Sequence, residues 1–416
     1  YYPALIVPFF FAGLCIGLSL DIWPERASTI YAANLVGSAA GSLAVLVLIP
    51  LLTGVGAVIA ASVLGMLAAV VFTFGPSGRQ FTRCFVYSML FVVLLVLLLH
   101  PPAWFALRMS PYKTLSQAML FPHARLIFSR WNAFSRIDVV ESAGIHSAPG
   151  LSLSFTGELP RQLGLLVDGA NLSPITCMQG PDDELFLQYL PTALPYAMRP
   201  QAQVLLIEPR GGLDILTALY SGASSVLALE SNPLVVHAVR EQTSTCSAAV
   251  YDDPRVRVVF DEARSYLRSS TEKFDIVLLS LTDTYQPVMS GAYSLSETYA
   301  YTVEAFLEYL RHLRDEGILV ISRWVQVPPS EELRACVLLA EALEQAGVVD
   351  PSKRVIAFRS WSTLTILAKR TPFHSAEIET LTEFCAERSF DLVYYDGMSI
   401  AEANRYNVLP DAAHYD

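Results

Sequence analysis

The sequence has little charge and lacks the residue pairs that mark metal and redox sites. Only 16% of its 416 residues are Asp, Glu, Lys or Arg, while 53% are hydrophobic, which is unusual for a soluble protein. The six cysteines are widely spaced without a CxxC pair, and the seven histidines form no HExxH-type pair. We therefore expect neither a disulfide framework nor a metal site. The length exceeds that of one typical domain.

Charge is scarcest in the first quarter of the chain. Residues 1–107 contain three basic and two acidic side chains, so the remainder carries 25 basic and 37 acidic ones. An acidic remainder argues against a nucleic-acid partner, because phosphates need basic contacts. It would suit a cationic substrate.

Four apolar segments follow one another in this quarter, at about 3–20, 29–51, 54–75 and 84–105. Each is near the roughly 20 residues that a helix needs to cross a bilayer. Residues 1–107 are therefore predicted to form about four transmembrane helices in a lipid bilayer. The chain starts inside an apolar run without a charged n-region, so we expect further helices before it rather than a signal peptide.

The second segment, "YAANLVGSAAG", carries polar and small residues on one helical face. Asn34, Gly37 and Gly41 lie at i, i+3 and i+7, and the two glycines form a GxxxG motif. This face predicts close helix packing, either within the protein or against other membrane subunits. Basic residues flank the helices on both sides, so the positive-inside rule does not select an orientation cleanly. We expect a bacterial inner-membrane protein whose remaining chain is cytoplasmic.

The rest of the chain predicts two further parts. Residues 108–200 contain a linker and β-like runs at 135–142, 151–157 and 163–169, typical of a small antiparallel module, followed by a helix at 182–198. From 201 to 416, strands alternate with helices, which favours a Rossmann-like α/β domain with a parallel sheet. The strands are expected at 203–208, 225–230, 256–260, 274–280 and 317–323, and the helices at 212–221, 232–242, 262–269 and 297–313. A helix at 330–346, an antiparallel pair within 354–370, another helix and a last β run should complete it.

Ligands of such sheets bind at the carboxyl ends of the strands. The stretch "VLLIEPRGGLDIL" after the first strand is predicted to be the cofactor loop, with Gly211 and Gly212 at its turn. Glu230 ends the second strand, 18 residues after Gly212, a spacing at which a carboxylate can accept hydrogen bonds from ribose hydroxyls. The other candidates at these strand ends are Glu208, Arg210, Asp214, Glu262, Ala263, Ser280 and Asp283.

The order of these parts resembles the spermidine synthase family of polyamine aminopropyltransferases, whose core is of the class I S-adenosylmethionine-dependent methyltransferase type. "YAANLVGSAAG" is similar to a "YAADLLGAALG"-type segment of membrane-fused members, with Asn34 in place of Asp. The similarity is also strong at "DPRVRVVFDEARSYL" and "GAYSLSETYAYTVEAFLEYL".

The resemblance implies S-adenosylmethionine or its decarboxylated form as cofactor and aminopropyl transfer to a polyamine. Glu230 would hold the ribose, Glu262 and Ala263 would lie near the adenine, and the loop from Glu208 through Asp214 would line the rest of the cofactor.

Two departures from the family weaken this expectation. The loop reads "EPRGGLD" instead of "GGGDGG" or "GPGGGLD", so Glu208 and Arg210 add side chains where glycines give space. The segment "SLTDT" places Ser280 where the family has its catalytic Asp, and a neutral Ser is a poor general base. Asp283 keeps the second acid.

Three hypotheses follow for the function. The first is a membrane-anchored transferase with an S-adenosylmethionine-type cofactor and an unknown acceptor. The second is a catalytically degenerate assembly subunit of a membrane complex. The third, a transporter, is weaker, because the visible helices carry hardly any ionisable residues.

Overall fold

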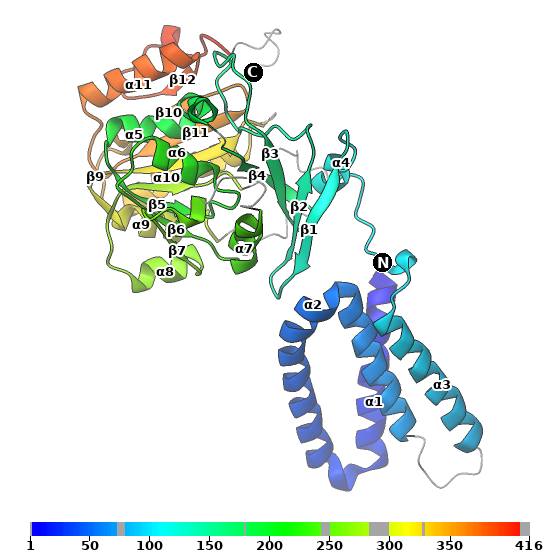
Figure 1. The fold of residues 1–416 in the computed structure, drawn as a ribbon. Helices are drawn as coiled ribbons and strands as arrows, with labels where there is room; N and C mark the ends of the chain where they lie inside the picture. The colour runs from blue at the N-terminus through cyan, green and yellow to red at the C-terminus, as the bar shows by residue number, and fades with distance from the viewer. Residues whose placement is uncertain are drawn as a thin grey trace. The chain divides into compact units, whose positions relative to one another are not determined.

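The computed structural model describes residues 2–72, 80–178, 180–242, 250–282, 299–326 and 329–407 (Figure 1). The chain forms two compact units. One comprises residues up to 108 together with 130–136, and the other comprises 109–129 and 137–416.

The N-terminal unit is helical, as the apolar segments predict. It contains α1 (Tyr2–Ile22), α2 (Ala27–Phe72) and α3 (Gln80–Leu99). Helix α2 is interrupted at Thr53, whose φ of 65° is not helical, and the halves on either side correspond to the expected segments 29–51 and 54–75. The segment expected at 84–105 begins and ends too late. Helix α3 begins at Gln80 and ends at Leu99, just before two prolines that cannot continue a helix.

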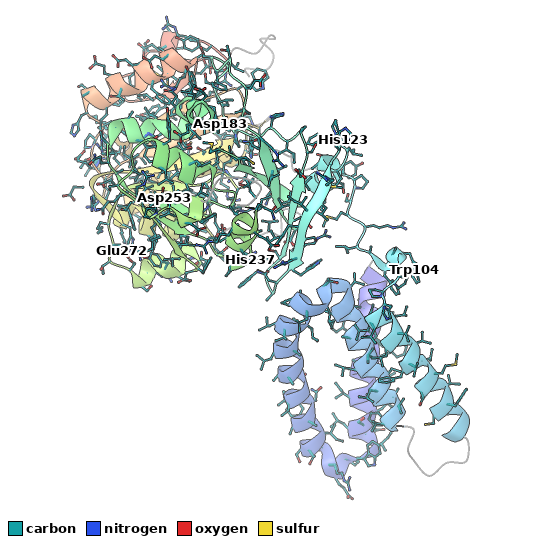
Figure 2. All side chains as sticks on the ribbon, in the orientation of Figure 1. Trp104, His123, Asp183, His237, Asp253 and Glu272 are labelled. Atoms are coloured by element: carbon teal, nitrogen blue, oxygen red, sulfur yellow. The ribbon has the colours of Figure 1, made fainter. Side chains whose placement is uncertain are left out.

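By length and composition, one helical stretch, Pro24–Phe72, is apolar enough to cross a membrane, and Ile6–Ile22 and Cys84–Leu99 are shorter apolar helices. Their aliphatic and aromatic side chains stand out from the ribbon in Figure 2, and Trp104 just beyond α3 is likewise exposed. Large apolar side chains that point outward on every helix are typical of a surface that meets lipid or other protein.

The second unit begins with a four-stranded sheet of order β1-β2-β3-β4. The runs at 135–142 and 163–169 form its central pair, β2 (Arg136–Glu141) and β3 (Gln162–Val167), which are antiparallel. Its outer strands are β1 (Arg125–Trp131) and β4 (Ala170–Thr176). Cys177, directly after β4, is disulfide-bonded, which the wide cysteine spacing did not predict.

Two expectations for this region are wrong. Residues 151–157 are not a strand, since the Ser152 hydroxyl accepts the Ser154 N–H at 3.0 Å and holds a turn instead. The helix expected at 182–198 is broken into the 3-10 segments Pro181–Tyr189 and Pro191–Ala193 and the short helix α5 (Leu194–Met198). Prolines at 191 and 195 remove backbone donors there, which shortens each segment.

The larger sheet confirms the predicted strand–helix alternation. Its order is β12-β10-β11-β9-β8-β5-β6-β7, with parallel pairing from β9 to β7 and antiparallel pairing of β9, β11, β10 and β12. The strands are β5 (Gln203–Ile207), β6 (Ser225–Leu229), β7 (Val256–Val259), β8 (Phe274–Leu279), β9 (Leu313–Trp324), β10 (Val355–Arg359), β11 (Thr363–Ala368) and β12 (Asp391–Tyr394).

Helices cover both faces of this sheet. Successive residues of a strand point to opposite faces, so each strand contributes side chains to two cores. Val204 and Leu206 join the core with α6 (Leu213–Tyr220), α7 (Pro233–Glu241), α11 (Ser375–Arg388) and the small sheet. Leu205 and Ile207 join the opposite core with the other three helices, α8 (Ala263–Ser269), α9 (Val303–Arg311) and α10 (Glu331–Gln345).

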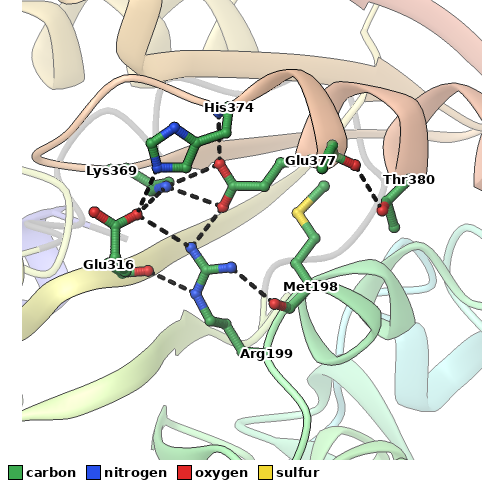
Figure 3. A network of polar contacts seen from close by, with 8 residues as sticks. Met198, Arg199, Glu316, Lys369, His374, Glu377 and Thr380 are labelled. Atoms are coloured by element: carbon green, nitrogen blue, oxygen red, sulfur yellow. Dashed lines mark hydrogen bonds and ion pairs between the residues drawn. The ribbon is translucent and has the colours of Figure 1, made fainter.

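A buried ionic network joins the antiparallel edge of the sheet to α11 (Figure 3). The Lys369 ammonium is fully buried and lies 2.6 Å from Glu316 and 2.9 Å from Glu377. Arg199 donates to Glu377 at 2.5 Å, and the His374 N–H donates to the same carboxylate at 2.8 Å. These contacts lower the pKa of Glu377 against the effect of its burial, so its negative charge is held in place.

Candidate functional site

Backbone hydrogen bonds align the carboxyl ends of the central strands. The Glu208 N–H donates to Leu229 at 2.9 Å, and the Ser280 N–H donates to Ile207 at 3.1 Å. Glu230 follows β6 in the same way, with its N–H bonded to Val259 at 3.0 Å. The structure therefore brings Glu208, Glu230 and Ser280 to one edge of the sheet, as their positions in the sequence predict.

The loop after β5 keeps a glycine-type backbone although two of its residues are not glycine. The φ angles are 56° at Glu208, 47° at Arg210 and 92° at Gly212. An L-residue in this left-handed region costs roughly 1–2 kcal/mol. A Cβ on Gly211 would lie 2.2 Å from the carbonyl oxygen of Pro174, so the close approach of β4 requires glycine at this position.

Glu230, the expected ribose ligand, lies in a buried acidic pair. Its carboxylate accepts the Arg210 N–H at 3.3 Å and the Asn232 N–H at 3.2 Å, and only 1% of the residue is exposed. The Glu208 carboxylate adjoins it and accepts the Ser231 N–H at 3.1 Å, which links the β5 end to the β6 end. Burial raises the pKa of Glu230 well above its ordinary value, and the neighbouring Glu208 carboxylate raises it further.

Arg210 supplies the compensating charge. Its guanidinium lowers the pKa of Glu230 by electrostatic attraction, and its carbonyl oxygen accepts the Tyr251 hydroxyl at 2.6 Å. One terminal nitrogen, Nη1, is buried and makes no hydrogen bond to any described residue. Arg210 therefore stabilises the acidic pair by charge more than by direct hydrogen bonds.

A cavity of about 50 Å³ lies beside this loop, between the ends of β5, β8 and β9 and the loop that precedes α5. Carboxylates and hydroxyls dominate its polar lining, with Trp324 as its largest apolar wall. Its polar lining includes Glu208, Asp214, Thr192, Ser280, Thr282 and Ser322. A small, acidic, hydroxyl-rich cavity favours a cationic group with several N–H donors.

Asp214 lies in the first turn of α6 and faces this cavity. Desolvation raises the pKa of its carboxyl, and the nearby hydroxyls of Ser280 and Thr192 offset part of the rise. The prediction grouped Asp214 with the cofactor loop, and in the structure Asp214 lines one cavity with Glu208 of that loop and with Ser280.

The candidates at the third strand end have local roles in the described structure. The Glu262 carboxylate caps α8, where it accepts the Ser265 N–H at 3.0 Å, and Ala263 is buried beneath the first turn. Asp283, the remaining acidic candidate, lies outside the described residues.

Sequence reasoning missed the residues that reach the site from outside the α/β domain. Ser173 on β4 accepts the Gly211 N–H at 3.0 Å, and Thr192 contributes a hydroxyl to the cavity. Neither residue belongs to a motif, and only the packing of the small sheet against the loop could have identified them.

Comparisons with known proteins give one family of relatives. No family model matches the chain. The polyamine aminopropyltransferase of Yersinia pestis (strain Pestoides F) is 29% identical over 107 residues, which cover 25% of this chain and 36% of the relative. That of Yersinia pseudotuberculosis serotype O:1b (strain IP 31758) gives the same values. The matched part thus spans about a third of the length of these relatives.

Two solved structures that are similar to this chain are a spermidine synthase and a probable spermidine synthase. The spermidine synthase of Thermotoga maritima matches with a TM-score of 0.42 and 19% identity, covering 69% of this chain and 85% of that chain. A probable spermidine synthase from Corynebacterium glutamicum matches with a TM-score of 0.43 and 15% identity, covering 67% and 98%.

Proposed function

We propose that this protein is a membrane-anchored, spermidine synthase-like transferase that uses S-adenosylmethionine or its decarboxylated form. The observation that carries this proposal is the cavity at the strand ends, where Glu208 and Asp214 lie next to the glycine turn. A sulfonium cofactor and an ammonium acceptor are both cations, and two carboxylates in a small cavity attract both. The partial similarity to polyamine aminopropyltransferases supports the same reaction class.

The loop backbone fits such a cofactor, and one side chain has to move. Gly211 and Gly212 form the turn, where Pro174 and Val250 pack against them, and Glu230 stands at the end of β6, where a ribose would bind. The Glu208 carboxylate lies across this position, and we infer that it rotates outward when the cofactor binds, because its residue is only partly buried. When bound, the cofactor would supply an electrophilic carbon next to its sulfonium.

The helical unit supports anchoring in the lipid bilayer. Pro24–Phe72 is long enough to span it, and the helices expose large apolar side chains. The expected location is the bacterial inner membrane. The expected cytoplasmic location of the α/β domain has one alternative, the opposite side of the membrane. Cys177 is disulfide-bonded, and disulfides are rare in the cytosol.

A second candidate function is a degenerate assembly subunit. Two observations favour it. Glu208 closes the crevice between the β5 and β6 ends by its bond to Ser231. In addition, beyond the adjoining backbone of α2 itself, no described atom lies within 4 Å of where a Cβ on Gly37 or Gly41 would be, so the face that also carries Asn34 is open to a helix of another membrane subunit.

Thermal unfolding with added ligand separates the two functions. The purified protein is heated with S-adenosylmethionine, its decarboxylated form or methylthioadenosine. A ligand at 100 times its dissociation constant stabilises the folded state by about 2.7 kcal/mol, which raises the melting temperature measurably. A rise with either sulfonium supports the transferase. No rise with any of the three contradicts it and leaves the assembly subunit.

A further inference from the structure

Asp214 lies near two buried hydroxyls, those of Ser280 and Tyr196. Ser280 is 7% exposed and Tyr196 is 4% exposed. Neither the Ser280 Oγ nor the Tyr196 hydroxyl makes a hydrogen bond of ordinary geometry within the described part of the chain. Both are near enough to interact electrostatically with Asp214. Because buried polar groups are normally satisfied, the Ser280 hydroxyl, which lines the cavity together with Asp214, indicates a polar ligand next to that carboxylate.

The proposed transfer needs a proton acceptor in this place. An alkylammonium has no free lone pair, so it must lose a proton before its nitrogen can attack carbon. Ser280, at the end of β8, cannot accept that proton at neutral pH without a neighbouring base.

Among the described residues, two carboxylates face the cavity, and they differ in their hydrogen-bond partners. The Glu208 carboxylate accepts the Ser231 N–H and adjoins Glu230. The Asp214 carboxylate lies beside the Ser280 and Thr192 hydroxyls, and among the described residues it makes no ion pair and accepts no backbone N–H. Asp214 is therefore the carboxylate that remains available for a ligand, and Tyr196 and Glu208 are the other titratable groups that face it.

We propose that Asp214 is the general base of this site and that its neighbour Ser280 orients the acceptor amine. A carboxylate on α6 then does the work of the Asp that the resembled family has at the position of Ser280. This inference rests on the proposed transferase function. The Asp214 carboxylate takes a proton from the acceptor ammonium. The freed nitrogen lone pair forms the new N–C bond as the C–S bond breaks, and the electron pair of that bond stays on sulfur as a neutral thioether. The product nitrogen keeps the positive charge until it loses its proton to solvent.

The test removes the carboxylate from α6 and then places one at the end of β8 instead. Four proteins are compared: wild type, Asp214→Asn, the double variant Asp214→Asn with Ser280→Asp, and Glu344→Gln as a control on an exposed helix position. Binding of 1,4-diaminobutane is measured by calorimetry between pH 5 and 9 without any donor. Melting with decarboxylated S-adenosylmethionine reports donor binding separately, and kcat and KM are measured where transfer occurs.

We expect wild type and Glu344→Gln to bind the diamine more tightly as the pH rises through the titration of Asp214. Asp214→Asn should lose this pH dependence, keep donor binding and lower kcat by about 100-fold or more, in the range of general-base effects. The double variant should recover part of both losses.

Three results would overturn the inference. They are diamine binding with the same pH profile in Asp214→Asn, an unchanged kcat in that variant, or the absence of diamine binding in wild type at every pH. Failure of donor binding in wild type with intact, Asp214-dependent diamine binding would instead refute the proposed transferase and keep Asp214 as the group that binds the ammonium.

Discussion

At the scale of single residues, Glu208 and Arg210 distinguish this loop from an open cofactor loop. Both have positive φ, and the Glu208 carboxylate lies across the expected ribose position next to Glu230. The sequence was enough to identify both residues as the ones that add side chains to this loop. It could not show that the Glu208 carboxylate accepts the Ser231 N–H after β6, because that contact depends on the register of β5 against β6.

Replacing both residues by glycine tests whether they block the loop. We expect Glu208→Gly with Arg210→Gly to raise the affinity for S-adenosylmethionine or its decarboxylated form by about tenfold or more, because the crevice opens without a change in backbone conformation. Isothermal titration gives the two dissociation constants. Glu344→Gln, at an exposed position of α10, serves as the control. Equal affinity in the double variant and wild type would show that these side chains do not obstruct binding.

The acidic pair also predicts a dependence of stability on pH. The folded-state pKa of Glu230 is raised, so its contribution to stability is fully present below the ordinary Glu pKa and is lost as the pH rises through the raised value. Glu208→Gln keeps the acceptor for the Ser231 N–H but removes the repelling charge. We expect it to stabilise the fold by about 1 kcal/mol at pH 8 and much less at pH 5.

Denaturant unfolding at the two pH values measures this effect, with Glu344→Gln as a control. A gain of equal size at pH 5 and pH 8 would mean that charge repulsion is not the cause.

At the scale of secondary structure, the apolar runs predicted most strands and helices of the α/β domain within a few residues. Continuous runs such as "VLLI" in β5 are buried on both faces, which makes them unambiguous. Irregular elements could not be predicted in this way. The 3-10 segments around Pro191 and the turn at Ser152 depend on proline and on side-chain hydrogen bonds, which compete with an apolar pattern.

The buried network at the edge of the sheet predicts a large effect of one substitution. Lys369→Met removes the fully buried cation between Glu316 and Glu377 and leaves Arg199 as the remaining Arg or Lys cation beside the two carboxylates. We expect a loss of about 3–5 kcal/mol in the free energy of unfolding. Equilibrium unfolding of the purified protein measures it.

Lys353→Met is the matched control, because Lys353 makes an exposed ion pair with Asp350 and should change stability little. Similar losses in the two variants would show that burial does not make the Lys369 network important.

At the scale of the whole molecule, the charge-poor N-terminal quarter and the acidic remainder correspond to different kinds of surface. Helices α1, α2 and α3 expose large apolar side chains, whereas the α/β domain encloses its apolar residues in two cores. Composition predicted this contrast directly, because long uncharged segments have few alternatives to a membrane or a protein partner.

The contrast predicts how the chain distributes in cells. The chain of residues 1–416 should remain in the membrane pellet after an alkaline carbonate wash, while residues 109–416 expressed alone should be released into the supernatant. Immunoblotting of the two fractions measures the partition. Release of residues 1–416 by carbonate would show that the helices do not span the bilayer.

The left-handed backbone at Glu208 and Arg210 also bears on how easily this loop could change during evolution. A non-glycine residue there costs roughly 1–2 kcal/mol, while glycine in an ordinary position costs about 0.5–1 kcal/mol in chain entropy. Glu208→Gly should therefore be neutral or slightly favourable for folding, whereas Arg210→Gly also removes the charge that stabilises the acidic pair. A lineage or a directed-evolution experiment could open the loop through single steps if Glu208 is replaced first, because Arg210 then no longer compensates two adjoining carboxylates.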